Sequence, residues 1–218
     1  MYLSRIALDI AKRDTMLALQ NPAMLHGAVE RAFEPRTQRA LWRLDRLAGQ
    51  QYLLLLSPEQ PNCTDLIRQF GTGAPAETRD YAPLLDRITP GSVWQFRLHA
   101  NPTYSTFDPQ ERGKVYACLL MRKTREPAPG QPEPKTQVGW LMKQGEQHGF
   151  TVEEQEISIL RNQWYTFCKK TGGRVRLLGV TYEGRLTVTD ADKFREALMA
   201  GIGRGKAYGM GLLTVMHP

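Results

Sequence analysis

The chain has 218 residues, 41% of them apolar, with 29 Lys and Arg against 22 Asp and Glu. This length suits one large domain or two of about 100 residues. The composition excludes a disordered chain and a small disulfide-built scaffold. The net charge of +7 and the pI of about 9.4 are typical of nucleic-acid-binding proteins, although a basic protein without a polyanionic partner fits the charge equally well.

The excess positive charge is concentrated in residues 161–218. Ten basic side chains stand there against four acidic ones, a difference of six out of the net seven. A charge gathered in one segment neutralises phosphates better than a diffuse one. The distribution therefore favours a polyanionic partner.

The cysteines and the apolar runs indicate the compartment. An odd number of widely spaced cysteines with no Cys-x-x-Cys pair argues against a zinc site and a disulfide framework and favours the cytoplasm: Cys63, Cys118 and Cys168. Arg5 and Asp9 interrupt the first apolar stretch, so we expect no signal peptide. The longest aliphatic run, Leu53–Leu56, is far too short to span a membrane. No metal ion or cofactor is expected either.

Strands and helices alternate over the first hundred residues. A helix begins at Asn21-Pro22, with Asn21 as its N-cap, and Pro35 ends it. A short helix or a turn is predicted at Lys12–Gln20, and a short helix at Thr64–Gln69. Alternating apolar residues predict four strands: Tyr2–Leu8, Ala40–Leu44, Gln51–Ser57 and Ser92–His99. This is the β-α-β-β-α-β order of a ferredoxin-like fold.

The second half carries an elaborated version of the same alternation. Helices are predicted at Lys135–Gly149 and, capped by Asp190, at Ala191–Ala200. The proline-rich stretch Arg125–Lys135 is predicted to be a connector. The predicted strands are Lys114–Met121, Phe150–Ile159, Trp164–Lys170, Arg174–Thr189 and Gly209–Met216. We therefore predict an α+β protein of two tandem ferredoxin-like domains, residues 1–100 and 101–218.

A glycine-rich segment, GIGRGKAYGMG, occupies residues 201–211. Gly203 and Gly205 allow a close backbone approach to a ligand, and Arg204 and Lys206 place cations beside those amides. The segment lacks the Gly-Lys-Ser/Thr of a Walker A loop and follows a helix, which excludes a dinucleotide fingerprint. The alternative is a loop that only lets a helix pack tightly against the closing strand.

Four motifs together identify a family resemblance. They are MYLSRI at the start, RLHANP at residues 97–102, YEGRLTV at 182–188, and the C-terminal G-x-G-x-G-K-A-x-G-x-G-L-L. In this order they resemble the CasE family, the precursor-RNA endoribonucleases of type I-E CRISPR (Cascade) systems. The resemblance implies two tandem ferredoxin-like domains, in agreement with the predicted element order.

His26 is the leading catalytic candidate. On the predicted helix it flanks the apolar stripe of Leu25, Val29 and Phe33, so it is neither fully core nor fully exposed. A histidine can transfer protons near neutral pH, as metal-independent RNA cleavage requires. By residue logic alone a structural boundary histidine is the commoner case. The resemblance implies the catalytic role, because the family's catalytic His lies on this helix.

The tyrosine that family members carry near this His is absent, since Ala23 and Met24 stand there. Tyr2 and Tyr208 are the distant residues that we consider as its replacement. Arg31 is a candidate for stabilising the charge of the reacting phosphate, with a solvated helix arginine as the alternative.

Several cationic residues are predicted to bind RNA. The hairpin tip around residues 171–173 carries basic side chains, which contact mostly shape and phosphate in an A-form stem; the alternative is a solvated tip. In the family a basic hairpin grips the repeat stem. The predicted RNA-binding residues are Lys169, Lys170, Arg174, Arg176, Arg97, His99, Gly203, Arg204, Gly205 and Lys206.

The resemblance implies the following activity. The enzyme binds the CRISPR repeat stem-loop, cuts at the 3′ base of the stem to leave a 2′,3′-cyclic phosphate and a 5′-hydroxyl, and stays on the crRNA among the other Cascade subunits. One alternative is a non-catalytic RNA-binding subunit of the same fold. Another, a ferredoxin-like protein that binds a small molecule, predicts neither the basic segment nor the four motifs.

Overall fold

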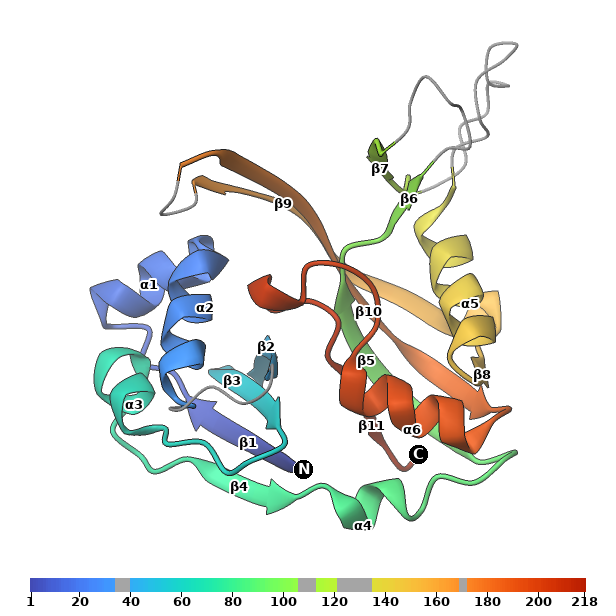
Figure 1. Ribbon diagram of the computed structural model, residues 1–218, viewed down its shortest axis with the longest axis horizontal. Helices are drawn as coiled ribbons and strands as arrows, with labels where there is room; N and C mark the ends of the chain where they lie inside the picture. Colours follow the sequence, from blue (N-terminus) through green and yellow to red (C-terminus); the bar gives the residue numbers. More distant parts are fainter. Residues whose placement is uncertain (34–39, 106–112, 121–134, 169–171) are drawn as a thin grey trace.

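The computed structural model describes residues 1–33, 40–105, 113–120, 135–168 and 172–218. Its first half forms an antiparallel sheet in the order β2-β3-β1-β4. The strands of this sheet are β1 (Tyr2–Ala7), β2 (Leu41–Leu47), β3 (Gln50–Ser57) and β4 (Glu77–Asp80). The helices that accompany it are α1 (Arg13–Gln20), α2 (Pro22–Arg31) and α3 (Thr64–Phe70). The short helix α4 (Ala82–Leu85) leads out of this unit (Figure 1).

The second half repeats this plan with two much longer strands, β9 and β10. Its sheet has the order β11-β5-β10-β8, and β9 pairs with β10. The strands are β5 (Val93–Ala100), β8 (Phe150–Thr151), β9 (Ile157–Cys168), β10 (Arg174–Val188) and β11 (Leu213–Met216). The helices are α5 (Gln137–Gln147) and α6 (Ala191–Ala200), with 3-10 turns η2 (Glu154–Glu156) and η3 (Lys206–Tyr208). A separate small hairpin joins β6 (Thr103–Ser105) to β7 (Val115–Ala117).

The two tandem ferredoxin-like units are confirmed by the strand order of the two sheets. In the first sheet β1 lies between β3 and β4, and in the second β5 lies between β10 and β11. One predicted strand was assigned to the wrong unit. Val93–Ala100 pairs with β10 and β11, so it begins the second unit, and Glu77–Asp80 completes the first. The sequence Glu-Thr-Arg-Asp lacks apolar alternation because β4 is a short, mostly exposed edge strand. The domain division at residue 100 remains a prediction, and the pairing favours a boundary between Asp80 and Val93.

The capping residues predicted for two helices are confirmed. The Asn21 side chain accepts a hydrogen bond from the Ala23 amide at the start of α2, with Pro22 in the first turn. The Asp190 side chain accepts one from the Lys193 amide at the start of α6. These caps satisfy amides that have no partner within the helix.

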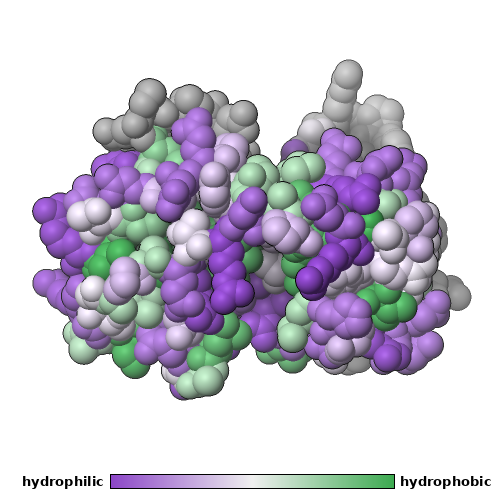
Figure 2. All heavy atoms as spheres, turned by 90° about the horizontal axis from the view of Figure 1, so that it is seen from below, coloured by the Kyte–Doolittle hydropathy of each residue, from purple (hydrophilic) through white to green (hydrophobic). Residues whose placement is uncertain are grey.

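The apolar run Leu53–Leu56 explains how the units join. Leu53 and Leu55 belong to the core beneath the first unit's helices, whereas Leu54 and Leu56 belong to the core that includes the second sheet. Both faces of this part of β3 are therefore buried, which is why the run Leu53–Leu56 is continuously apolar. Viewed from below, the surfaces of both units are mostly hydrophilic with smaller apolar areas between (Figure 2). Within the described ranges, no helix is long and apolar enough to cross a membrane.

Candidate active site

Helix α2 presents His26 at its edge. Leu25, Ala28 and Val29 face the core, and the His26 side chain retains 32% of its exposure. Its Nε2 lies 3.4 Å from Oε1 of Glu30, one helical turn further on. A carboxylate at this position restricts the orientation of the imidazole while leaving the rest of the ring accessible. The predicted boundary position of His26 is thus confirmed.

The second unit brings Tyr208 to His26. The two rings meet edge to face, with centroids 6.0 Å apart and an interplanar angle of 63°. Tyr208 ends η3, which lies beside α2 and between the two halves of the molecule (Figure 1). A histidine from residue 26 and a phenol from residue 208 therefore share one surface, although 182 positions separate them in the chain.

Glycines bring η3 this close to the first unit. Gly205 and Gly209 flank η3 in left-handed conformations, which glycine adopts at little cost. A Cβ on Gly209 would stand 2.5 Å from the ring of Trp42 in β2. The alternative interpretation of this segment, tight packing, is therefore supported here. The same packing delivers Tyr208 to His26, so the two interpretations are compatible.

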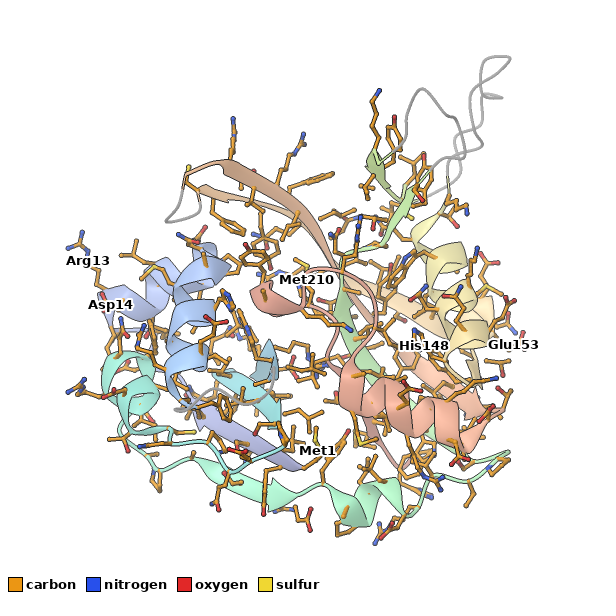
Figure 3. All side chains as sticks on the ribbon, viewed as in Figure 1. Met1, Arg13, Asp14, His148, Glu153 and Met210 are labelled. Atoms are coloured by element: carbon orange, nitrogen blue, oxygen red, sulfur yellow. The ribbon has the colours of Figure 1, made fainter. Side chains whose placement is uncertain are left out.

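An apolar cluster between the β9–β10 hairpin and α2 holds Tyr208 in place. Tyr165, Phe167 and Met210 are its buried members, and Ala23 and Tyr208 pack against them. The ring centroids of Phe167 and Tyr208 are 4.9 Å apart. Figure 3 places Met210 beside η3, beneath the hairpin. Because Ala23 has only a methyl group, this site has room for a tyrosine supplied by the other unit.

Of the other two residues considered beside His26, Tyr2 lies elsewhere, whereas the guanidinium of Arg31 reaches back along α2 to Gly27. Tyr2 pairs with Ser57 and Asp80 at the start of β1, and no contact with His26 is found among the described residues. Arg31 is exposed and lies five residues after His26 on the same helix. That spacing turns its Cα by about 140° around the helix axis from His26. Among the contacts of the described residues, Tyr208 is the one predicted supporting residue that packs against the His26 ring.

The structure argues against phosphate contacts at Arg97 and His99. Arg97 forms ion pairs with Glu183 and with Asp45. His99 is 9% exposed, and its Nδ1 lies 2.8 Å from Oγ1 of Thr181. Burial lowers its pKa to about 4, helped by the positive charge of Arg43, so the ring is neutral at physiological pH. Both residues have packing roles in the second sheet.

A buried arginine that the sequence analysis missed joins the two sheets. Arg43 in β2 is 1% exposed and donates to both carboxylate oxygens of Asp45, to the carbonyls of Arg97 and Leu212, and to Oγ1 of Thr214. Burial acts to raise the pKa of Asp45, but the hydrogen bonds and charge of Arg43 hold it below its ordinary value. The signal in the sequence is an Arg and an Asp two positions apart on one face of an apolar strand.

The other predicted RNA-binding residues lie in two segments, the β9–β10 hairpin and the glycine-rich segment. Arg174 and Arg176 are exposed near the tip of the hairpin, whereas Lys169 and Lys170 lie outside the described residues. Arg204 is exposed in the glycine-rich segment, and Lys206 begins η3 with its side chain partly buried. Gly203 packs against the Trp140 ring and Gly205 against Met210.

Other possible sites lie apart from His26. A groove of about 640 Å³ lies between the two sheets, lined by Leu3, Phe96, Arg97, Glu183 and others. Neither His26 nor Tyr208 lines it. In the part of the chain that the structure describes, no cluster of three or more His, Cys, Asp or Glu is arranged to hold a metal ion.

Comparisons with known proteins identify the family to which the chain belongs. The sequence model of the family described as CRISPR associated protein matches residues 1–217. The chain belongs to this family. It is 29% identical over 230 residues to the CRISPR-associated endoribonuclease Cse3 of Thermus thermophilus, covering 99% of both chains. It is 31% identical over 124 residues to the CRISPR system Cascade subunit CasE of Escherichia coli, covering 55% of this chain and 56% of that one. A solved structure of Cse3 bound to a 19-nucleotide RNA superposes with a TM-score of 0.75 at 28% identity, covering 99% of this chain and 100% of that one.

Proposed function

We propose that this chain is an endoribonuclease that binds the stem-loop of a CRISPR repeat and cuts the precursor RNA at the 3′ base of the stem. The observation that carries the proposal is the edge-to-face contact of His26 and Tyr208, beside a segment rich in arginine and lysine. The relatives named as an endoribonuclease and as a Cascade subunit support the substrate class. The RNA-bound relative supports the same class of ligand.

The proposed chemistry is a proton-transfer reaction without a metal ion. The 2′-hydroxyl attacks the adjacent phosphorus, the bond to the 5′-oxygen breaks, and a 2′,3′-cyclic phosphate and a 5′-hydroxyl are formed. One group must accept the proton of the 2′-hydroxyl and one must protonate the leaving oxygen. His26 performs one of these transfers, because its half-exposed ring is oriented by Glu30 and accessible to a ligand.

Tyr208 performs the role of the missing helix tyrosine. Its phenol donates a hydrogen bond to the phosphate as negative charge builds up in the transition state. Arg31, Arg204 and Lys206 then contribute positive charge to the binding of the same backbone. Ala23 and Tyr208 pack against the same apolar cluster, which supports the replacement of a helix tyrosine by one from the other unit.

The product is proposed to stay bound. The basic hairpin of β9 and β10 holds the repeat stem, so the protein remains on the 3′ hairpin of the crRNA as a Cascade subunit. This assembly belongs to the cytoplasm, where the precursor RNA is made.

The test is cleavage of repeat RNA in EDTA under single-turnover conditions. Wild-type protein is expected to yield a cyclic phosphate, and His26→Ala to bind the RNA with unchanged Kd but cut it about 10²- to 10⁴-fold more slowly. Tyr208→Phe is expected to slow cleavage by about 10²- to 10³-fold without changing the Kd. Tyr2→Phe is the matched control and should cut like the wild type.

Each alternative predicts a different result. A non-catalytic RNA-binding subunit would bind the repeat and leave it intact in every variant. A protein of another class would not bind it at all. Wild-type rates in His26→Ala would remove His26 from the mechanism.

A further inference from the structure

One tryptophan differs from the other three. Trp42, Trp94 and Trp140 are between 2% and 8% exposed, whereas Trp164 in β9 is 46% exposed. An indole is large and mostly apolar, so leaving it in water forgoes a substantial gain from burial. Trp164 is therefore placed where packing of the fold does not require it.

The two faces of the β9–β10 hairpin have different roles. Tyr165 and Phe167, with Val175 and Leu177 opposite them, face inward and pack over η3. Side chains alternate along a strand, so Trp164 and Arg176 lie on the opposite, outward face. The inward face secures Tyr208, and the outward face is not needed for that contact.

Arg176 orients the exposed ring. Its guanidinium carbon lies 4.1 Å from the centroid of the Trp164 ring, in a cation–π arrangement. In the register of the two strands, Trp164 faces Leu178 and Arg176 faces Thr166, so the stacked pair lies on a diagonal. An indole held flat by a guanidinium is a preformed stacking surface.

The charge around this surface indicates an anionic partner. From Ile157 to Tyr182 the sequence has five Arg and Lys and no Asp or Glu. Of these, Arg161, Arg174 and Arg176 are described and exposed. A protein surface would need acidic groups to match this hairpin, whereas a nucleic-acid backbone supplies one negative charge per nucleotide.

Within RNA, the exposed indole selects a particular element. The bases of an A-form stem are stacked and their faces covered, so a stem cannot offer a base to a flat aromatic ring. An unpaired nucleotide offers its whole face, and base–aromatic stacking tolerates any base. We propose that Trp164, held by Arg176, stacks on an unpaired nucleotide that flanks the repeat stem. This inference rests on the proposed function and adds a single-stranded element to the RNA that the protein recognises.

The experiment compares two RNAs: the repeat stem-loop with its single-stranded 5′ and 3′ flanks, and the same stem-loop trimmed of both flanks. Trp164→Ala is expected to weaken binding of the flanked RNA about tenfold and to leave binding of the trimmed RNA unchanged. The flanked RNA should also quench the fluorescence of the wild type more than that of Trp164→Phe, because the other tryptophans are buried. Leu160→Ala removes another exposed apolar side chain of β9 and should bind both RNAs like the wild type.

Two results would overturn the inference. Trp164→Ala could bind both RNAs as tightly as the wild type, which would leave this face to a protein partner. It could instead lose affinity for both RNAs equally, which would mean that the ring supports the stem contact or the hairpin itself. If the wild type bound neither RNA, the proposed function would fail, and that result is distinct from both.

Discussion

The two ferredoxin-like units share one strand order but differ in what they add to it. The first has strands of four to eight residues, regular helices and a histidine on one of them. The second lengthens two strands to 12 and 15 residues and ends in a glycine-rich segment with a single 3-10 turn. The common fold supplies rigidity, and the departures from it supply the hairpin and Tyr208. The candidate active site lies where the units differ and where they meet.

Removing the arginine that joins the units should have the largest effect. Arg43→Met leaves the buried Asp45 carboxylate with only the longer ion pair to Arg97, which is expected to lower the free energy of unfolding by about 3–5 kcal/mol. The measurement is urea-induced unfolding. Arg46→Met changes an exposed arginine of the same strand and should cost less than about 0.5 kcal/mol. Equal losses in both variants would contradict a special role for Arg43.

The buried histidine of the second unit, His99, should make the stability of the folded chain depend on pH. The ordinary pKa of 6.5 applies to His99 in the unfolded chain, and burial lowers it to about 4 in the folded one. Between these values the unfolded chain binds more protons, so acid favours unfolding. The stabilisation is complete above pH 6.5 and falls by roughly 3 kcal/mol as the pH drops to 4.

The measurement for His99 is the free energy of unfolding between pH 4 and 7. His99→Gln should remove this part of the slope, whatever its absolute stability. His217→Gln, which removes an exposed histidine, is measured alongside it as the matched substitution. An unchanged slope in His99→Gln would show that other groups produce it.

The smallest predicted effect separates backbone strain from packing at the contact of the units. Gly209→Ala and Gly49→Ala both place a side chain at a positive φ, and each should cost about 1–2 kcal/mol. Only Gly209 has a ring in the way, that of Trp42, whereas a Cβ at Gly49 meets nothing within 4 Å. Gly209→Ala should therefore cost about 1 kcal/mol more and slow cleavage by displacing Tyr208. Thermal unfolding and single-turnover cleavage measure both consequences.

Local signals in the sequence were sufficient for the elements that carry them. Asn21-Pro22 and Asp190 mark helix starts through their own chemistry, and the edge position of His26 follows from helical spacing. The strand Glu77–Asp80 carries no such signal, because an exposed edge strand needs no apolar face. For that reason the sequence pattern predicts Ser92–His99 as the fourth strand of the first unit, whereas β5 pairs with β10 of the second.

The rest of the site depends on contacts between distant residues. The sequence offered Tyr2 and Tyr208 equally, and only the packing of η3 on α2 distinguishes them. The sequence analysis predicts that His99 binds RNA. In the structure its ring is buried against Tyr165 and Thr181, which lie far along the chain. The spacing of Arg43 and Asp45 on one strand indicates only that these two can pair. The remaining partners of Arg43 lie in the other unit and cannot be read from the sequence.

The partners of Arg43 also delay stable folding until synthesis at the ribosome is nearly complete. Arg43 is translated early, whereas Leu212 and Thr214 follow it by 169 and 171 positions. Until those residues emerge, the guanidinium lacks two acceptors that its buried place requires. A chain released before them would hold an incompletely paired charge in its core and be a ready substrate for proteases. The same late segment contains Tyr208. A nascent chain therefore becomes stable at nearly the same moment as Tyr208 becomes available to pack beside His26.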